Sequence, residues 1–153
     1  MRQTATAEDI RSLVNSLNFA EKVERSVLPR GQGETILVVD DEAGIRGLMR
    51  KILKRERYEV VEAASAEEAL KAVAALGKPI DLLLTDVMLP GMLGSELAQR
   101  MRAAQPSIKV LYISGYTQDE AVRSGDTPPG AKFLAKPFTL GALLGKVRET
   151  LDA

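Results

Sequence analysis

The chain has 153 residues, 45% of them apolar, which suits one folded domain with a sizeable core and room for a short appendage. Its 21 basic and 21 acidic side chains cancel at pH 7, so no overall charge favours direct binding of nucleic acid or of an anionic membrane. The chain has no cysteine and no histidine, which excludes disulfides, thiolate nucleophiles and imidazole bases and leaves only hard, oxygen-ligated cations as metals.

The first 33 residues differ in pattern from the rest. Apolar residues at helical spacing predict a helix that Thr6 caps and that runs to about Arg25, before "SVLPRGQG" forms a linker. The apolar stripe consists of Ile10, Leu13, Val14, Leu17, Ala20 and Val23. Three partners could cover it: the chain's own domain, a second copy in a coiled-coil-like pair, or a neighbouring domain. We therefore expect two units, residues 1–33 and residues 34–153, with self-association through the helix as one of the open alternatives.

The N-terminal region contains no apolar run of signal-peptide length. Nor does any stretch approach the roughly 18 apolar residues that a membrane span needs. From these patterns we expect a cytoplasmic protein that binds no membrane.

From residue 34 onward, apolar runs of strand length alternate with segments of helical period. The runs are "TILVVD", "YEVVEA", "IDLLLTD", "KVLYIS" and "KFLAK". Ser65 begins a capping box, Gly77 suits a helix stop, and Thr139 can cap the last helix. Leu93, Leu97 and Met101 mark a third helix that should end before Pro106, and the fourth crossover leaves room for only about two helical turns.

This alternation defines the predicted fold. Strands joined by crossover helices form βαβ units, and right-handed crossovers give a largely parallel sheet with helices on both faces. We predict an α/β fold of the flavodoxin-like kind: a doubly wound five-stranded parallel sheet with five flanking helices, plus the N-terminal helical extension. A mixed sheet of another topology is the alternative.

Polar side chains follow four of the five predicted strands. Asp40 and Asp41 follow the first strand, Asp86 the third, Ser114 the fourth and Lys136 the fifth. Because the carboxyl ends of parallel strands lie along one edge, a single cleft should gather three carboxylates, a hydroxyl and an ammonium. Taken one at a time, each aspartate also has a purely structural interpretation, because aspartates at the ends of strands often cap helices or form turns.

The expected cluster favours phosphoryl chemistry with a metal ion. Two carboxylates about 4 Å apart repel by roughly 4 kcal/mol at an effective dielectric near 20, so three must take up protons or bind a cation. Mg²⁺ suits such a site because it keeps several waters, whereas Ca²⁺ requires a fuller oxygen cage. Asp86 is the candidate nucleophile that forms an acyl phosphate, and the pair Asp40 and Asp41 suits the metal. Ser114 and Lys136 could contact phosphoryl oxygens.

With these residues in view, the sequence resembles the response-regulator receiver domain of two-component signalling over about residues 34 to 152. The motifs that carry the resemblance are "ILVVDDE", "LLLTDVMLPGMLG", "LYISGYT" and "FLAKPF", in the family's order and at its spacing. The ending that begins with "VLYISGYT" looks most like receivers attached to hybrid histidine kinases.

The resemblance implies a role for each residue of the site. Asp40 and Asp41 correspond to the acidic metal pair. Asp86 corresponds to the phosphoacceptor, which also binds the metal, and the backbone carbonyl of Met88 to a further ligand of Mg²⁺. Lys136 corresponds to the invariant lysine.

Further positions are implied to govern switching and water access. Ser114 and Phe133 correspond to the two switch residues, and the Lys136–Pro137 peptide is expected to be cis. Met88 and Tyr116 occupy the positions that modulate how water reaches the acyl phosphate. Because neither side chain is an acid or an amide that could orient water, we expect slow self-dephosphorylation.

The resemblance also implies a function. A histidine kinase or a phosphotransfer protein would phosphorylate the chain, which has no histidine to be such a kinase itself. The phosphoprotein would then switch a face formed by the fourth helix, fifth strand and fifth helix toward an unknown downstream protein, catalysing only its own phosphorylation and dephosphorylation. One alternative is an interaction domain that is never phosphorylated. Another is a Mg²⁺-dependent phosphohydrolase, which Met88 disfavours because a second acid would be needed there to protonate the leaving group.

Overall fold

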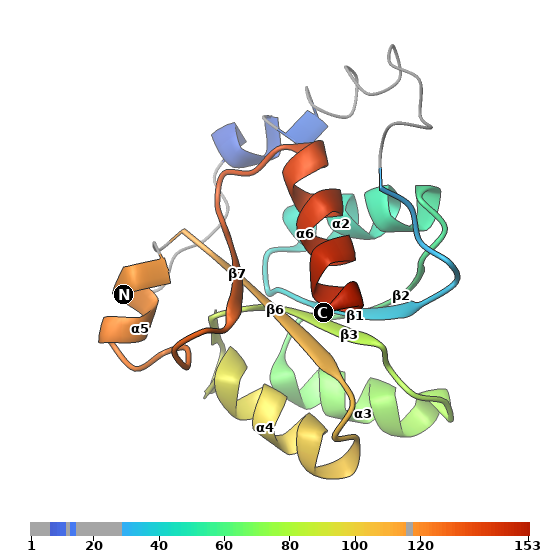
Figure 1. Cartoon of the computed structure of the whole chain (residues 1–153), viewed down its shortest axis with the longest axis vertical. Coiled ribbons are helices and arrows are strands. Elements are labelled where there is room, and N and C mark those ends of the chain that lie inside the picture. Colours follow the sequence, from blue (N-terminus) through green and yellow to red (C-terminus); the bar gives the residue numbers. More distant parts are fainter. Residues whose placement is uncertain (1–6, 12, 15–28, 116–117) are drawn as a thin grey trace.

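The structure, a computed structural model, describes residues 7–11, 13–14, 29–115 and 118–153. Its centre is a sheet of five parallel strands in the order β2-β1-β3-β6-β7 (Figure 1). The strands are β1 (Thr35–Val39), β2 (Glu59–Ala63), β3 (Leu82–Asp86), β6 (Lys109–Ser114) and β7 (Lys132–Ala135). After β2 the chain crosses to the other side of β1, which places β3 in the centre of the sheet.

Helices cover both faces of the sheet. On one face lie α2 (Ala43–Arg55) and α6 (Leu140–Asp152), and on the other lie α3 (Ala66–Leu76) and α4 (Gly94–Ala104) (Figure 1). The short α5 (Gln118–Arg123) flanks β7, in keeping with the two turns expected for this crossover. The predicted doubly wound fold with five flanking helices is thus confirmed, and residues 7–11 and 13–14 are helical as well. No helix in the described ranges is long and apolar enough to span a membrane.

The helix signals in the sequence are satisfied by hydrogen bonds and backbone geometry. The Ser65 hydroxyl accepts a hydrogen bond from the amide of Glu68 at 3.2 Å, and the Thr139 hydroxyl accepts one from Ala142 at 3.1 Å. Gly77 ends α3 with φ of 72°, a left-handed conformation that glycine adopts without a steric penalty.

One element was not predicted, namely a short antiparallel pair between β3 and α4. It consists of β4 (Met88–Leu89) and β5 (Met92–Leu93), joined by a turn in which Gly91 has φ of 76°. Two-residue strands are too short to leave an alternating pattern in the sequence. Leu93, one of the residues that mark the predicted third helix, lies in β5 and is the N-cap residue of α4, which begins at Gly94.

The apolar core has two halves, one on each face of the sheet. In β1, Ile36 and Val38 face α2 and α6, whereas Leu37 and Val39 face α3 and α4, and all four are 0% exposed. A strand buried on both faces needs apolar residues at every position, which explains the uninterrupted run of residues 36–39.

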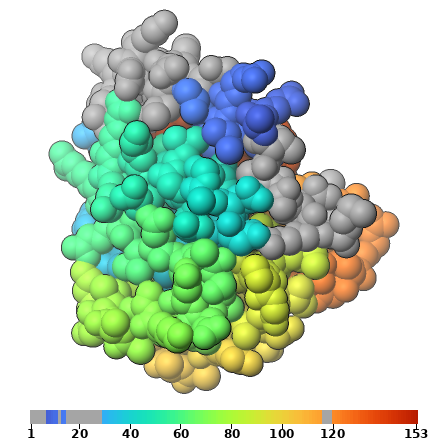
Figure 2. Space-filling view, turned by 180° about the vertical axis from the view of Figure 1, so that it is seen from behind, coloured from blue at the N-terminus to red at the C-terminus, as the bar shows by residue number. Residues whose placement is uncertain are grey.

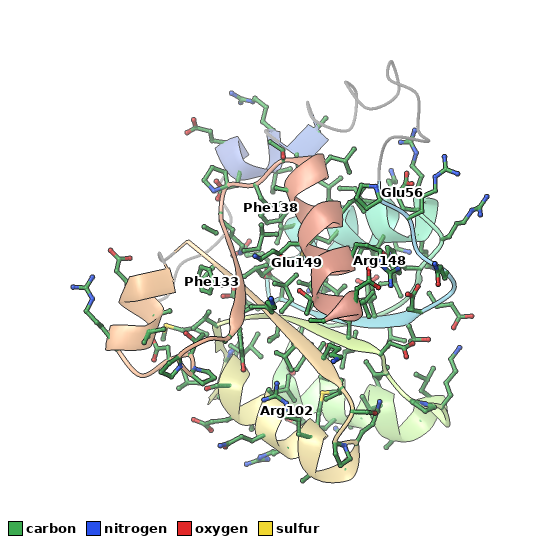
Figure 3. The ribbon with its side chains drawn as sticks, in the orientation of Figure 1. Glu56, Arg102, Phe133, Phe138, Arg148 and Glu149 are labelled. Atoms are coloured by element: carbon green, nitrogen blue, oxygen red, sulfur yellow. The ribbon has the colours of Figure 1, made fainter. Side chains whose placement is uncertain are left out.

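The N-terminal helical residues pack on the α2 and α6 face. Leu13 is 1% exposed and belongs to the same apolar cluster as Phe138, which Figure 3 shows beside α6. A side-chain atom of Ile10 lies 3.1 Å from where a β-carbon on Gly44 would stand, and Figure 2 shows residues 7–11 and 13–14 (blue) against α2 (teal). Contacts with the chain's own domain therefore cover this part of the stripe, although Val14 is 39% exposed. The remaining predicted positions (Thr6, Leu17, Ala20, Val23 and Arg25) lie outside the described residues.

Candidate functional site

Three carboxylates meet at the carboxyl edge of the sheet. Asp40 and Asp41 directly follow β1, and Asp86 ends β3, which pairs with β1 in parallel. Carboxylate oxygens of the three side chains lie within 4.8 Å of one another. Asp40 is 0% and Asp86 1% exposed, whereas Asp41 is half-buried. The sequence prediction that these residues share one cluster agrees with this geometry.

One ammonium group lies among these carboxylates. The Nζ atom of Lys136 is 3.3 Å from Oδ2 of Asp40 and 3.7 Å from Oδ2 of Asp86. Lys136 follows β7, its amide donates a hydrogen bond to the carbonyl of Ser114 at 2.8 Å, and its peptide bond to Pro137 is cis. Three carboxylates against one ammonium leave an excess of negative charge in a largely buried site, which favours an additional cation.

Backbone hydrogen bonds orient two of the carboxylates. Oδ1 of Asp40 accepts a hydrogen bond from the amide of Glu42 at 2.9 Å, next to the start of α2. Oδ1 of Asp86 accepts one from the amide of Met88 at 3.4 Å. These bonds aim both side chains along the same edge, toward the third carboxylate and the lysine.

Two residues that sequence reasoning missed support the cluster from outside. A β-carbon on Gly94, at the start of α4, would collide with the backbone carbonyl of Asp86. The guanidinium of Arg46 donates hydrogen bonds to the carbonyl of Asp40 at 2.8 Å and to the carboxylate of Glu62 at 3.1 Å. The only signal for Gly94 was its place at the start of a helix, and nothing in the sequence marked Arg46, because both roles depend on contacts between distant segments.

The remaining predicted positions surround the cluster less directly. Ser114 is 2% exposed at the end of β6, between the strands that carry Asp86 and Lys136. Phe133, on β7, is 8% exposed and packs in the cluster on the α3 and α4 face (Figure 3). The side chain of Met88 is half-buried, while Tyr116 lies outside the described residues.

The donor set fits a magnesium ion. All three clustered side chains offer carboxylate oxygens, and hard divalent cations prefer oxygen ligands. Mg²⁺ in particular is commonly held by one or two carboxylates together with waters and a phosphate oxygen.

Known proteins share this fold and much of this sequence. The chain is 38% identical to the sensor kinase CckA of Brucella abortus (strain 2308) over 134 residues, which cover 86% of this chain and 14% of that kinase. It is 35% identical to the response regulator receiver protein CpdR of the same organism, covering 77% of this chain and 97% of CpdR. The chain thus corresponds to a small part of the kinase but to nearly the whole of CpdR.

Solved structures give the same result. The receiver domain of the hybrid histidine kinase CckA is 35% identical, with a TM-score of 0.64 over 76% of this chain and 98% of that one. The response regulator TrrA of Thermotoga maritima, solved in complex with Mg²⁺ and BeF, is 31% identical, with a TM-score of 0.63 over 76% of this chain and 98% of that one. The family description "Response regulator receiver domain" matches residues 36–148. The chain therefore belongs to the response regulator receiver family, the phospho-accepting signalling domains of two-component systems.

Proposed function

We propose that Asp86 accepts a phosphoryl group from the phosphohistidine of a histidine kinase or of a phosphotransfer protein. The observation that carries this proposal is the placement of one buried carboxylate at the end of the central strand, 3.7 Å from the ammonium of Lys136 and beside two further carboxylates. In the transfer, an oxygen of Asp86 forms the new bond to phosphorus while the bond between phosphorus and the donor's imidazole nitrogen breaks. The imidazole nitrogen then takes a proton from solvent.

Phosphoryl transfer of this kind depends mostly on position and on charge neutralisation. Asp40, Asp41 and Asp86, with the backbone carbonyl of Met88, would hold Mg²⁺, which when bound neutralises charge on the carboxylates and the phosphoryl oxygens. Lys136 supplies a second positive charge, 3.7 Å from Oδ2 of Asp86. TrrA, which was solved with Mg²⁺ and BeF, supports this assignment by analogy.

Switching would follow from the new charge at Asp86. A phosphoryl group favours whichever conformation binds it better, and a hydroxyl that donates to one of its oxygens provides such a preference. Ser114 is the candidate for that hydroxyl, and Phe133 is the candidate for a side chain that repacks with it. The face formed by α5, β7 and α6 would carry the change to an unknown downstream protein, although α5 has only six residues.

The intact mass of the protein after incubation with acetyl phosphate tests the phosphoacceptor role. We expect one added phosphoryl group that requires Mg²⁺ and is absent in Asp86→Asn. In Lys136→Gln we expect the rate of addition to fall by about 100-fold, in line with the loss of one preorganised charge in a buried site. An adduct that persists in Asp86→Asn would contradict the assignment.

Two alternative functions can be distinguished from the proposed one with the same purified protein. A phosphohydrolase with an aspartyl nucleophile would turn over p-nitrophenyl phosphate repeatedly, which we do not expect because Met88 is not an acid. An interaction domain that is never phosphorylated would show no adduct with acetyl phosphate or with a phosphorylated histidine donor.

A further inference from the structure

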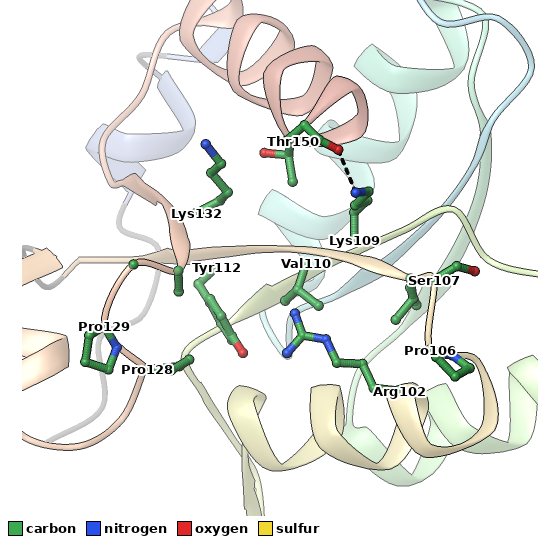
Figure 4. Close-up of a pocket in the computed structure, with 14 residues that line it drawn as sticks. Arg102, Pro106, Ser107, Lys109, Val110, Tyr112, Pro128, Pro129, Lys132 and Thr150 are labelled. Carbon is green, nitrogen blue, oxygen red and sulfur yellow. Dashed lines mark hydrogen bonds between the residues drawn. The ribbon is translucent and has the colours of Figure 1, made fainter.

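A cavity of about 480 Å³ lies at the edge of the sheet opposite the acidic site, where β6 and β7 begin (Figure 4). Its walls come from α4, from the start of β6, from the loop before β7 and from the end of α6. This volume is in the range of pockets that hold small molecules, roughly 300–1,000 Å³. None of the residues assigned to phosphoryl transfer lines it.

The cavity exists because β7 begins late. β6 pairs with β3 from Lys109 onward, but its pairing with β7 begins only at Leu111. Lys109 and Val110 of β6 therefore pair with β3 on one side but have no strand beside them on the side where β7 lies. Pro128 and Pro129 precede β7, and since proline has no N–H group to donate to a sheet, this loop cannot extend the strand backward.

The charged side chains around the cavity are all basic. Arg102, Lys109 and Lys132 line it, and no acidic side chain is among its described lining residues. Lys109 donates a hydrogen bond to the main-chain oxygen of Ala153 at 2.6 Å, but the side chains of Arg102 and Lys132 form no hydrogen bond or ion pair within the described part of the chain. The acid that lies near Lys132 is Glu149, which is already in an ion pair with Lys146 at 2.9 Å.

The floor of the cavity combines an apolar surface with one neutral donor. Tyr112 is 2% exposed. In Figure 4 its hydroxyl points toward the same side of the cavity as the side chain of Arg102, which extends from α4. Burial raises the pKa of Tyr112, with a smaller opposing effect from the charge of Arg102, so the phenol is protonated at neutral pH and can donate a hydrogen bond. Val110, Pro128 and Pro129 add apolar surface beside it.

We propose that this cavity binds a small organic anion, an apolar body that carries one carboxylate or phosphate-type group. The anionic group would pair with the guanidinium of Arg102 and accept a hydrogen bond from the hydroxyl of Tyr112. The apolar body would lie against Val110 and the two prolines, and Lys132 would add attraction at longer range. An unpartnered arginine beside a buried hydroxyl is suited to planar anions, since the guanidinium can donate two parallel hydrogen bonds.

Titration of the full-length, ¹⁵N-labelled protein with phenylphosphonate tests this proposal. The probe has an aromatic body and an anionic group but no phosphoryl group that it can transfer, and the titration is run without Mg²⁺. We expect saturable chemical-shift changes at the amides of Val110, Tyr112 and Gly130. A parallel titration with benzoate identifies which anionic group binds more tightly.

Two matched variants on α4 make the result specific. Arg102→Gln should weaken phenylphosphonate binding by about tenfold, the loss expected for one charge-assisted hydrogen bond. Arg100→Gln removes the same charge from an exposed position outside the cavity and should leave the affinity unchanged. The proposal fails if neither probe gives saturable shifts at these amides, if shifts are confined to residues around Asp86, or if Arg102→Gln binds as tightly as the unaltered protein.

Discussion

Gly94 lies directly against the backbone of Asp86, so closely that a β-carbon at position 94 would collide with the Asp86 carbonyl oxygen and come within 3.1 Å of the Thr85 side chain. Gly94→Ala should therefore shift the end of β3, lowering the free energy of unfolding by about 1–3 kcal/mol, as overpacking does elsewhere. The same shift should slow phosphorylation by acetyl phosphate. Urea unfolding and intact mass measure the two effects.

The matched control for this substitution is Gly145→Ala on α6, where an added β-carbon would meet no atom within 4 Å apart from its chain neighbours and its own helix backbone. There we expect stabilisation of up to about 1 kcal/mol, because alanine is the better helix former. If Gly94→Ala were as stable and as readily phosphorylated as the unaltered protein, the packing of α4 against β3 would not matter to the site.

Asp41 allows the proposed metal site to be tested without disturbing the core, since its side chain is only half-buried. Mg²⁺ should raise the melting temperature of the unaltered protein. At a Mg²⁺ concentration one hundred times the dissociation constant, binding should add about 2.7 kcal/mol to the free energy of unfolding. We expect Asp41→Asn to lose most of this rise. Glu42→Gln, a neighbouring acid outside the cluster, should keep it, and an equal loss in both variants would argue against a defined site.

The lifetime of the acyl phosphate should depend on Met88, whose side chain cannot orient a water molecule. After removal of acetyl phosphate, the decay of the phosphorylated mass should be slow. In Met88→Asn it should be faster by about tenfold, less than the roughly 10²–10⁴-fold that a fully positioned acid or base contributes. Met92→Asn, in the paired strand β5, is the control. A half-life of only seconds that Met88→Asn leaves unchanged would overturn this expectation.

Arg148 on α6 joins two acids, with Nη2 at 2.6 Å from Glu34 and 2.7 Å from Asp152 (Figure 3). Burial raises the pKa of Glu34, but its hydrogen bonds to Arg148 and to backbone amides outweigh this and lower the pKa overall. The hydrogen bond to Arg148 also lowers the pKa of Asp152. Because both folded-state pKa values are depressed, the stabilisation is present above about pH 4.5 and is lost as the pH falls through the lowered values.

Arg148→Gln should therefore lower the urea midpoint at pH 7, and the difference from the unaltered protein should shrink as the pH falls below 4.5. Lys51→Gln, an exposed position on α2, controls for the loss of one charge. A difference that is constant across this pH range would mean that the carboxylates are not its source.

Leu13 provides a test of how the N-terminal helix is covered. Leu13→Ala should lower the free energy of unfolding by about 2–5 kcal/mol, as for other buried leucines. Val14→Ala, at a position 39% exposed, should cost much less. If packing within the chain explains the burial of Leu13, the effect will not vary with protein concentration, which sedimentation and unfolding at two concentrations would establish.

The sequence predicted the sheet, and the gathering of the three carboxylates at its edge, because both depend on local signals and topology. Uninterrupted short runs such as residues 36–39 are typical of doubly buried strands, and caps such as Ser65 act within a single turn. Once the strands are parallel, Asp40 and Asp86 must lie at the same edge. The cis peptide at Lys136 was implied by the resemblance and is present.

Other features could not be predicted because they depend on contacts between distant segments. Gly94 matters through the backbone it touches, and the cavity arises from the offset between the starts of β6 and β7. Neither feature leaves a periodic pattern in the sequence. The division of the chain at residue 33 stays a prediction, since part of the N-terminal segment lies outside the described residues.

The position of β7 at the margin of the sheet affects how easily the site can deform. β3, which carries Asp86, is hydrogen-bonded to a strand on each side, whereas β7, which carries Phe133 and leads into Lys136, is bonded to β6 alone. A displacement of β7 breaks one ladder of hydrogen bonds, and the same displacement of β3 would break two. The candidate phosphoacceptor thus ends a strand that is held on both sides, whereas the lysine follows a strand that is held on one side only. We therefore expect a change in charge at Asp86 to be expressed mainly as movement of β7.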